Sequence, residues 1–172
     1  MSIKNRLLDA KALINQGRHE GALLSLLVAV AATSRKRYPH RPQRKSKGTK
    51  KAKKTKVGPP VMGDREAFTA FVRESMKIIA NCENYFVTFR SASVRLEDVL
   101  YEHLRCELAH AAKLPNDVAF VVGKPGALSV KVEPSRITFS TGLLDSLYRA
   151  VVLAKENAVD LAQVAPAGTL EV

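Results

Sequence analysis

A basic segment near the middle of the chain constrains the fold more than any other feature. Residues 35–56 carry twelve Lys and Arg side chains and no Asp or Glu. The segment has no apolar period; it contains Pro39, Pro42 and Gly48, and Pro59 and Pro60 follow shortly after it. A stretch of this kind cannot bury enough apolar surface to fold alone. We therefore predict a disordered insert at 35–63, a single helical domain built from 1–34 and 64–158, and a C-terminal tail at 159–172.

The net charge of the chain is +12, and all of it belongs to this segment, since sixteen basic residues balance sixteen acidic ones elsewhere. Cations at such density attract polyanions, and RNA is the expected partner, bound with a salt-dependent affinity. A solubilising tether and a nuclear-import signal have the same composition, and both alternatives stay open. The candidate nucleic-acid-binding residues are Arg35, Lys36, Arg37, Arg41, Arg44, Lys45, Lys47, Lys50, Lys51, Lys53, Lys54 and Lys56.

Length and composition bound the remaining possibilities. A chain of 172 residues is long enough to bury one core without covalent staples. Its two cysteines, Cys82 and Cys106, form no disulfide framework, which favours a reducing compartment. The N-terminus is charged and helix-periodic, unlike a signal peptide, and the longest apolar run has about half the length of a membrane span. We expect a soluble, cytoplasmic protein that does not associate with membranes.

Apolar periodicity predicts helices on both sides of the basic segment. The first covers 2–16 and breaks at Gln16-Gly17, and 19–34 is apolar enough to be central in a bundle. The third starts with Asp64 as N-cap and presents one apolar face, made of Phe68, Phe71, Val72, Ser75, Met76 and Ile79. The fourth covers 94–113. The last is capped by Ser140 or Thr141, and its apolar side holds Leu143, Leu144, Leu147, Tyr148, Val151 and Val152.

Short alternating runs predict a small β component. Residues 85–89 favour an extended piece, and 118–122 and 128–132, separated by a stretch with two glycines and a proline, favour a β-hairpin. Residues 136–139 are a candidate third strand. The fold class is therefore mainly α, a bundle of about five helices with a small β-hairpin appendage.

The fourth helix carries an unusual octet, HLRCELAH, at 103–110. At about 100° per residue, the core stripe of this helix contains Leu96, Leu100, Leu104, Leu108 and Ala111. A second face, made of Glu102, Arg105, Cys106, Ala109 and His110, is suited to a partner helix or a substrate.

Ordinary structural roles also explain this second face. They are an Arg105–Glu102 ion pair and a histidine, His110, near the negative end of the helix. A metal site at His103, Cys106 and His110 is a further alternative, but it lacks a recognisable fourth ligand. We therefore expect neither a metal nor a cofactor.

The run Arg105-Cys-Glu-Leu-Ala-His110 resembles the Arg-x4-6-His motif of the HEPN superfamily (higher eukaryotes and prokaryotes nucleotide-binding domains). The stretch LLDAKALINQGRHEGALLSLLVAVAATSRKRYP is similar to the helix pair that opens many such domains. LYEHLRCELAHAAKLPNDVAF is similar to the motif region of a bacterial branch with a following hairpin. The resemblance covers 2–34 and 64–158. It implies a HEPN-like helical bundle that cleaves RNA without a metal, at the interface of a homodimer.

The resemblance assigns catalytic roles to two residues. His110 would act as general base or acid on a 2′-hydroxyl, and Arg105 would brace the phosphate. Many HEPN nucleases have a polar residue directly after the arginine, where this chain has Cys106. This departure keeps two alternatives open, a non-catalytic module that binds nucleic acid or an antitoxin-like protein partner, and a purely structural dimer.

Overall fold

The computed structural model describes residues 2–39, 62–111 and 113–162. Helices α1 (Ile3–Asn15) and α2 (His19–Arg37) form an antiparallel pair, joined by a tight turn at Gly17. Gly17 has φ +69°, and its N–H donates to the Ile14 carbonyl at 2.9 Å. Because this left-handed conformation favours glycine, the predicted break at Gln16-Gly17 is confirmed.

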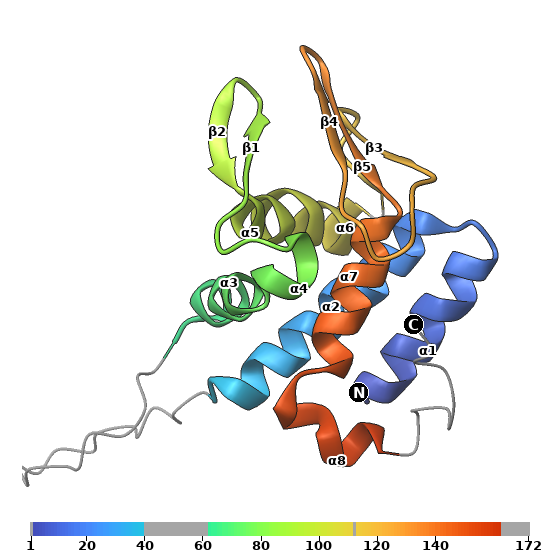
Figure 1. The fold of residues 1–172 in the computed structure, drawn as a ribbon, viewed down its shortest axis with the longest axis vertical. Coiled ribbons are helices and arrows are strands. Elements are labelled where there is room, and N and C mark those ends of the chain that lie inside the picture. The colour runs from blue at the N-terminus through green and yellow to red at the C-terminus, as the bar shows by residue number, and fades with distance from the viewer. Residues whose placement is uncertain (1, 40–61, 112, 163–172) are drawn as a thin grey trace, which may run out of the picture.

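Helix α2 lies at the centre of the bundle and packs against α1, α3 and α7 (Figure 1). Its fully buried side chains are those of Ala22, Leu23, Leu26, Leu27, Ala29 and Val30. The predicted central helix is therefore confirmed. It ends at Arg37 rather than Ser34, so the predicted start of the insert at Arg35 is wrong by three residues.

Helices α3 (Asp64–Glu74) and α4 (Met76–Ala80) follow the segment that is not described. Every member of the predicted apolar face is buried, from Phe68 to Ile79. The predicted N-cap is wrong, because Gly63 occupies that position and its N–H donates to Glu66 Oε2 at 3.0 Å. Asp64 is the first helical residue, and its carboxylate accepts hydrogen bonds from Arg35 instead.

Strands β1 (Phe86–Phe89) and β2 (Ala92–Arg95) form an antiparallel hairpin. The predicted extended piece is thus confirmed, but its partner strand takes Val94 and Arg95 from the predicted fourth helix. The two-residue turn consists of Arg90 and Ser91, which both have positive φ, at 50° and 64°. This type of turn matches the strand twist but normally selects Gly or Asn, which the sequence does not offer here.

The predicted fourth helix, which carries the Arg105–His110 motif and is called the motif helix below, has three parts. They are α5 (Leu96–Asp98), the π-helix η1 (Val99–Arg105) and α6 (Cys106–Ala111). Its four predicted core leucines are buried, whereas Ala111 is exposed. A π-helix makes i→i+5 hydrogen bonds and turns less per residue than an α-helix. Side chains around η1 therefore do not point where a 100° wheel places them.

A second sheet contains β3 (Val118–Val121), β4 (Val130–Glu133) and β5 (Arg136–Ser140), in the order β3-β5-β4. The third strand is confirmed, but the predicted pairing of the first two is wrong. β5 lies between them, parallel to β3 and antiparallel to β4. The two-residue Pro134-Ser135 turn joins β4 to β5, and the longer β3–β4 connection crosses over. Both β elements project from the same end of the bundle (Figure 1).

Helix α7 (Gly142–Val152) returns to the core beside α2 and α4. The predicted apolar side is confirmed, with four residues buried and Tyr148 and Val152 half-buried. Thr141 stands at the N-cap, but its hydroxyl accepts the Gly123 N–H at 3.1 Å rather than capping the helix. A side chain at Gly142 would not fit, since its Cβ would lie 2.0 Å from the Ala127 carbonyl oxygen.

The chain then forms the 3₁₀ turn η2 (Lys155–Asn157) and the short helix α8 (Ala158–Leu161). A tail starting at 159 is therefore wrong for its first residues, because Leu161 is only 6% exposed and α8 contacts α1. Residues 163–172 of the predicted tail lie outside the described residues. None of the described helices is long and apolar enough to cross a membrane. The mainly α class, a helical bundle with small β additions, is confirmed.

Candidate nucleic-acid interface

The end of α2, the start of α3 and the motif helix meet at Asp64. Arg35 donates to Asp64 Oδ1 from Nε at 2.7 Å and from Nη2 at 2.5 Å. Its Nη1 also donates to the Met62 carbonyl at 2.9 Å. The other carboxylate oxygen, Asp64 Oδ2, accepts a hydrogen bond from Arg105 Nη2 at 3.4 Å. The two flanks of the basic segment are thus joined to each other and to the motif arginine.

Arg105 is held on several sides. Its side chain is 24% exposed, and its guanidinium lies 5.0 Å from the Tyr101 ring centroid and 5.8 Å from that of Phe68. Hydrogen bonding to Arg35, and then the charges of Arg35 and Arg105, hold the pKa of the Asp64 carboxyl below its usual value against desolvation. Arg105 therefore forms part of a charged and aromatic cluster with α3.

The predicted Arg105–Glu102 pair is wrong. Glu102 pairs with Arg65 of α3, whose guanidinium also reaches Asp98 at 3.5 Å. The π-helix explains the difference, because residues three apart in η1 are not stacked as they are in an α-helix. Glu102 therefore pairs with Arg65 of α3, and Asp64 pairs with Arg35 of α2 as well as with Arg105.

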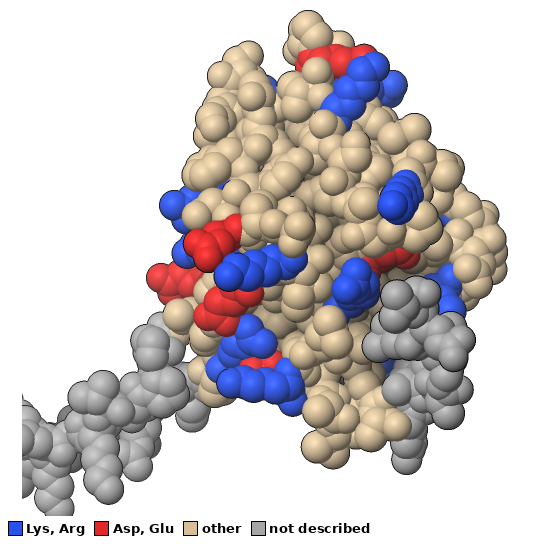
Figure 2. All heavy atoms as spheres, in the orientation of Figure 1, with Lys and Arg blue, Asp and Glu red and all other residues tan. Residues whose placement is uncertain are grey.

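Three of the twelve candidate nucleic-acid-binding residues are ordered parts of α2. Besides Arg35, Lys36 Nζ lies 2.5 Å from Asp160, and Arg37 pairs with Glu74 at 2.6 Å and Glu156 at 2.7 Å. These acids come from α3, η2 and α8, which the sequence does not place beside α2. Figure 2 shows the resulting mixture of positive and negative side chains over the end of α2 and the start of α3. The other nine candidates, listed above from Arg41 to Lys56, lie outside the described residues.

His110 and Arg105 have different surroundings within one chain. His110 is exposed on α6, and among the described residues no hydrogen bond or ion pair joins it to Arg105. The metal alternative also finds no support in the described part of the chain, where no three His, Cys, Asp or Glu side chains are arranged to hold a metal ion. His103 instead packs its ring 4.7 Å from that of Phe89.

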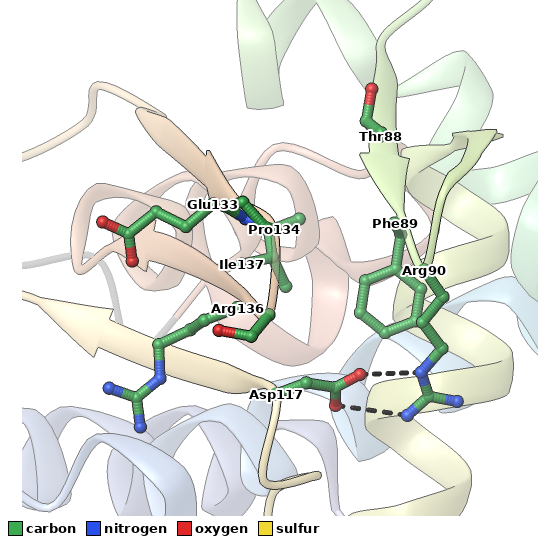
Figure 3. A pocket seen from close by; sticks show the side chains of 9 residues that line it. Thr88, Phe89, Arg90, Asp117, Glu133, Pro134, Arg136 and Ile137 are labelled. Carbon is green, nitrogen blue, oxygen red and sulfur yellow. Dashed lines mark hydrogen bonds and ion pairs between the residues drawn. The ribbon is translucent and has the colours of Figure 1, made fainter.

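A second cluster, which the sequence did not reveal, lies at the tip of the β1–β2 hairpin (Figure 3). Arg90 binds Asp117 through two hydrogen bonds, Nε–Oδ2 at 2.7 Å and Nη2–Oδ1 at 3.2 Å. The Arg90 guanidinium also lies 4.8 Å from the Phe89 ring centroid. The hydrogen bond from Arg90 is the main cause that lowers the pKa of the Asp117 carboxyl.

This cluster borders a cavity of about 140 Å³ between the hairpin turn and the β4–β5 turn. Its charged lining residues are two arginines and two carboxylates, Arg90, Arg136, Asp117 and Glu133. Because these charges balance, the cavity favours neither anions nor cations. No signal in the sequence pointed to this cluster. The turn at Arg90-Ser91 lacks the usual Gly or Asn, and Asp117 is too distant in the chain to be inferred as the partner of Arg90. The Arg90–Asp117 pair fastens the hairpin tip to the loop that precedes β3.

One family comparison identifies the chain. The family model described as Rv1289 matches residues 2–165, which is nearly the whole sequence. No curated protein and no solved structure matches the chain. On the extent of the family match, the chain belongs to the Rv1289 family.

Proposed function

We propose that the chain is a HEPN-like RNA-binding protein, in which the nine Lys and Arg residues of 41–56 capture the phosphate backbone. The observation that carries the proposal is the Arg35–Asp64–Arg105 cluster. It ties the flanks of the basic segment to the motif arginine. An RNA strand drawn to the segment therefore arrives beside Arg105 and the motif helix.

The charge distribution supports this proposal. Cations at the base of the segment have carboxylate partners, as Arg35, Lys36 and Arg37 do. Residues 40–61 contain no Asp or Glu, so neutralisation within the segment has to come from outside it. Lys and Arg side chains that neutralise phosphates release the counterions condensed on the nucleic acid, and this release drives salt-sensitive binding.

Metal-independent RNA cleavage by a homodimer is the second candidate function, and the sharing of Asp64 favours it. If Arg105 moves to a phosphate, it gives up one contact at 3.4 Å, while Arg35 keeps Asp64 paired through two shorter hydrogen bonds. Arg105 is therefore available for phosphate without leaving a carboxylate unpaired.

The reaction needs a proton acceptor beside the RNA. His110 is exposed, and a ring nitrogen of an imidazole can accept a proton. In the proposed step His110 removes the proton of a 2′-hydroxyl, whose oxygen attacks the phosphorus. The bond to the 5′-oxygen breaks, and that oxygen leaves as a hydroxyl after taking a proton from solvent water, to which protonated His110 later returns its own. The products are a 2′,3′-cyclic phosphate and a 5′-hydroxyl. The resemblance implies that motif residues of two subunits meet at one interface, and we propose that Arg105 and His110 act there across the two subunits.

Binding is tested by fluorescence anisotropy with a labelled RNA. A variant in which 40–61 are replaced by a short Gly/Ser linker keeps Arg35, Lys36 and Arg37 with their partners. We expect it to unfold at nearly the wild-type temperature and to lose most RNA affinity and most of the salt slope. Unaltered RNA affinity in this variant defeats the proposal.

Cleavage and dimerisation are tested separately. We expect His110→Ala to abolish cleavage while RNA binding survives, and Arg105→Lys to be strongly impaired, because an ammonium lacks the planar two-pronged contact. Chelator is expected to change nothing. Ala109→Arg places bulk on the proposed interface, so light scattering should show loss of the dimer. RNA that stays intact with wild-type protein across salt and pH eliminates the nuclease, and a monomeric wild type eliminates its shared site.

A further inference from the structure

A cavity of about 350 Å³ lies at the opposite end of α2 from Asp64. It forms where the α1–α2 turn meets strands β3 and β5. Its lining includes Gly17, His19, Glu20, Leu114, Phe120 and Arg136. The cavity thus joins the turn that opens α2, the segment that follows the motif helix, and the start of the central strand β5.

Arg136 supplies the main charge of this cavity. Its side chain is exposed and makes no ion pair within the described residues. The neighbouring carboxylate of Glu133 pairs with Lys131 at 2.8 Å. Figure 3 shows the Arg136 guanidinium pointing away from the Arg90–Asp117 pair. It points instead toward the N-terminal helices, whose residues line the other side of the cavity.

Three further basic side chains belong to this end of the molecule. His19 lines the cavity, with its ring centroid 6.3 Å from that of Phe120. Arg18 lies between two lining residues, and Lys113 directly precedes Leu114; both are exposed, and no described carboxylate pairs with them. Glu20 is the one carboxylate among the lining residues. Among the lining residues and their neighbours in the chain, basic side chains therefore outnumber the one carboxylate, Glu20.

The position of the cavity relates it to the motif helix. η1 and α6 contact α2, with Arg105 beside Asp64 at one end and Leu114 in the cavity at the other. From His19 to Arg35, at 1.5 Å per residue, α2 extends about 24 Å. The exposed His110 lies in the chain between Arg105 and Leu114. A strand that follows the motif helix from the Asp64 end thus leads to the cavity.

We propose that this cavity binds a phosphodiester group of the same RNA that the basic segment captures, an inference that rests on the proposed function. The Arg136 guanidinium provides a fork of donors that fits phosphate oxygens. Lys113 and Arg18, each next in the chain to a lining residue, add positive charge to this end of the molecule, and His19 offers a ring N–H donor. The RNA is then held at two points about 24 Å apart, the length of α2 between His19 and Arg35.

The test is the double variant Arg136→Gln/Lys113→Gln, measured by fluorescence anisotropy with a single-stranded RNA of about thirty nucleotides. The matched control is Lys4→Gln/Lys124→Gln, which removes the same charge at the far end of α1 and in the β3–β4 connection. We expect the site variant to lose about tenfold in affinity at low salt. Its log–log salt slope is expected to fall by about 1.4, since each lost contact to a single strand removes about 0.7. The control should change affinity less than about twofold. Thermal unfolding of both variants checks that they are folded.

Four outcomes separate the proposals. A site variant that binds like the control, while wild type binds RNA with a steep salt slope, overturns the second site and leaves the proposed function standing. A wild type that binds no RNA overturns both. The variant Arg136→Lys/Lys113→Gln is compared with Arg136→Gln/Lys113→Gln. If lysine at position 136 restores the RNA affinity only in part, this supports a phosphate contact that depends on the guanidinium fork. Competition by inorganic phosphate alone, without effect of the variants on RNA, identifies a site for free phosphate instead and also overturns the inference.

Discussion

Replacing Asp64 by Asn tests whether the junction of the basic segment and the motif helix faces RNA. The substitution removes one negative charge and keeps the shape of the side chain and an oxygen that accepts from Arg35. The carboxylate is 56% exposed, so its ion pairs are worth at most about 1 kcal/mol each to folding. We expect the variant to fold with a small loss of stability.

The effect on RNA is expected to be the opposite of the effect on stability. Arg105 Nη2 lies 3.4 Å from Asp64 Oδ2. A phosphate held by Arg105 therefore lies close to the Asp64 carboxylate. Two like charges about 4 Å apart in a solvent-exposed site repel by about 1 kcal/mol, which is a factor of about five in affinity. Asp64→Asn should therefore bind RNA about three- to tenfold more tightly at low salt. The gain should vanish at high salt, where the repulsion is screened.

The control is Asp160→Asn, which makes the same change in net charge. Asp160 is 53% exposed and pairs with Lys36, away from Arg105. Titration of labelled RNA at low and high ionic strength compares the two variants. Equal gains in both indicate only the change in net charge, and no gain in Asp64→Asn places Arg105 outside the interface. Either result refutes the reasoning.

Three further predictions concern the fold that supports the interface. Asn157→Ala removes a fully buried side chain whose Nδ2 donates at 2.9 and 2.8 Å, and chemical denaturation should show a loss of about 2–4 kcal/mol. Gly142→Ala forces a Cβ onto the Ala127 carbonyl, and the same measurement should show a loss of at least about 2 kcal/mol. Arg37 lowers the folded pKa of Glu156, so this pair stabilises the fold above the unfolded pKa and the contribution disappears as pH falls through the folded value. Unfolding temperatures of Glu156→Gln should accordingly fall less steeply with acid than those of wild type.

Local patterns predicted the helices well, because a period of 3.6 residues needs only neighbouring residues to show a buried face. Phe68 and Ile79, for example, are buried as the period requires. The strand order failed for the opposite reason. Whether β3 pairs with β4 or β5 depends on contacts between distant residues, such as the hydrogen bond from Ser140 Oγ to the Ala127 carbonyl at 3.0 Å.

The basic segment shows the same limit. Composition alone does not tell a solvated cation from one with a distant partner. Arg37 is continuous in sequence with the segment, but it pairs with Glu74 and with Glu156, more than a hundred residues later. The sequence itself locates the charge excess. The carboxylate partners of Arg35, Lys36 and Arg37 could be identified only from the fold.

The motif helix shows how far a helical wheel misleads when a π-helix is present. The octet 103–110 begins in η1 and ends in α6, so a uniform rotation of about 100° per residue does not apply across it. His103 packs on Phe89, Arg105 is directed to Asp64 and the aromatic rings of α3 and η1, and His110 remains exposed. Cleavage by Arg105 and His110 is proposed to need two subunits, whereas RNA binding through the basic segment needs only one chain. The oligomeric state in solution therefore decides first between the two candidate functions. Cleavage by Arg105 and His110 requires a dimer that Ala109→Arg disrupts. Binding through the basic segment is expected with or without a dimer.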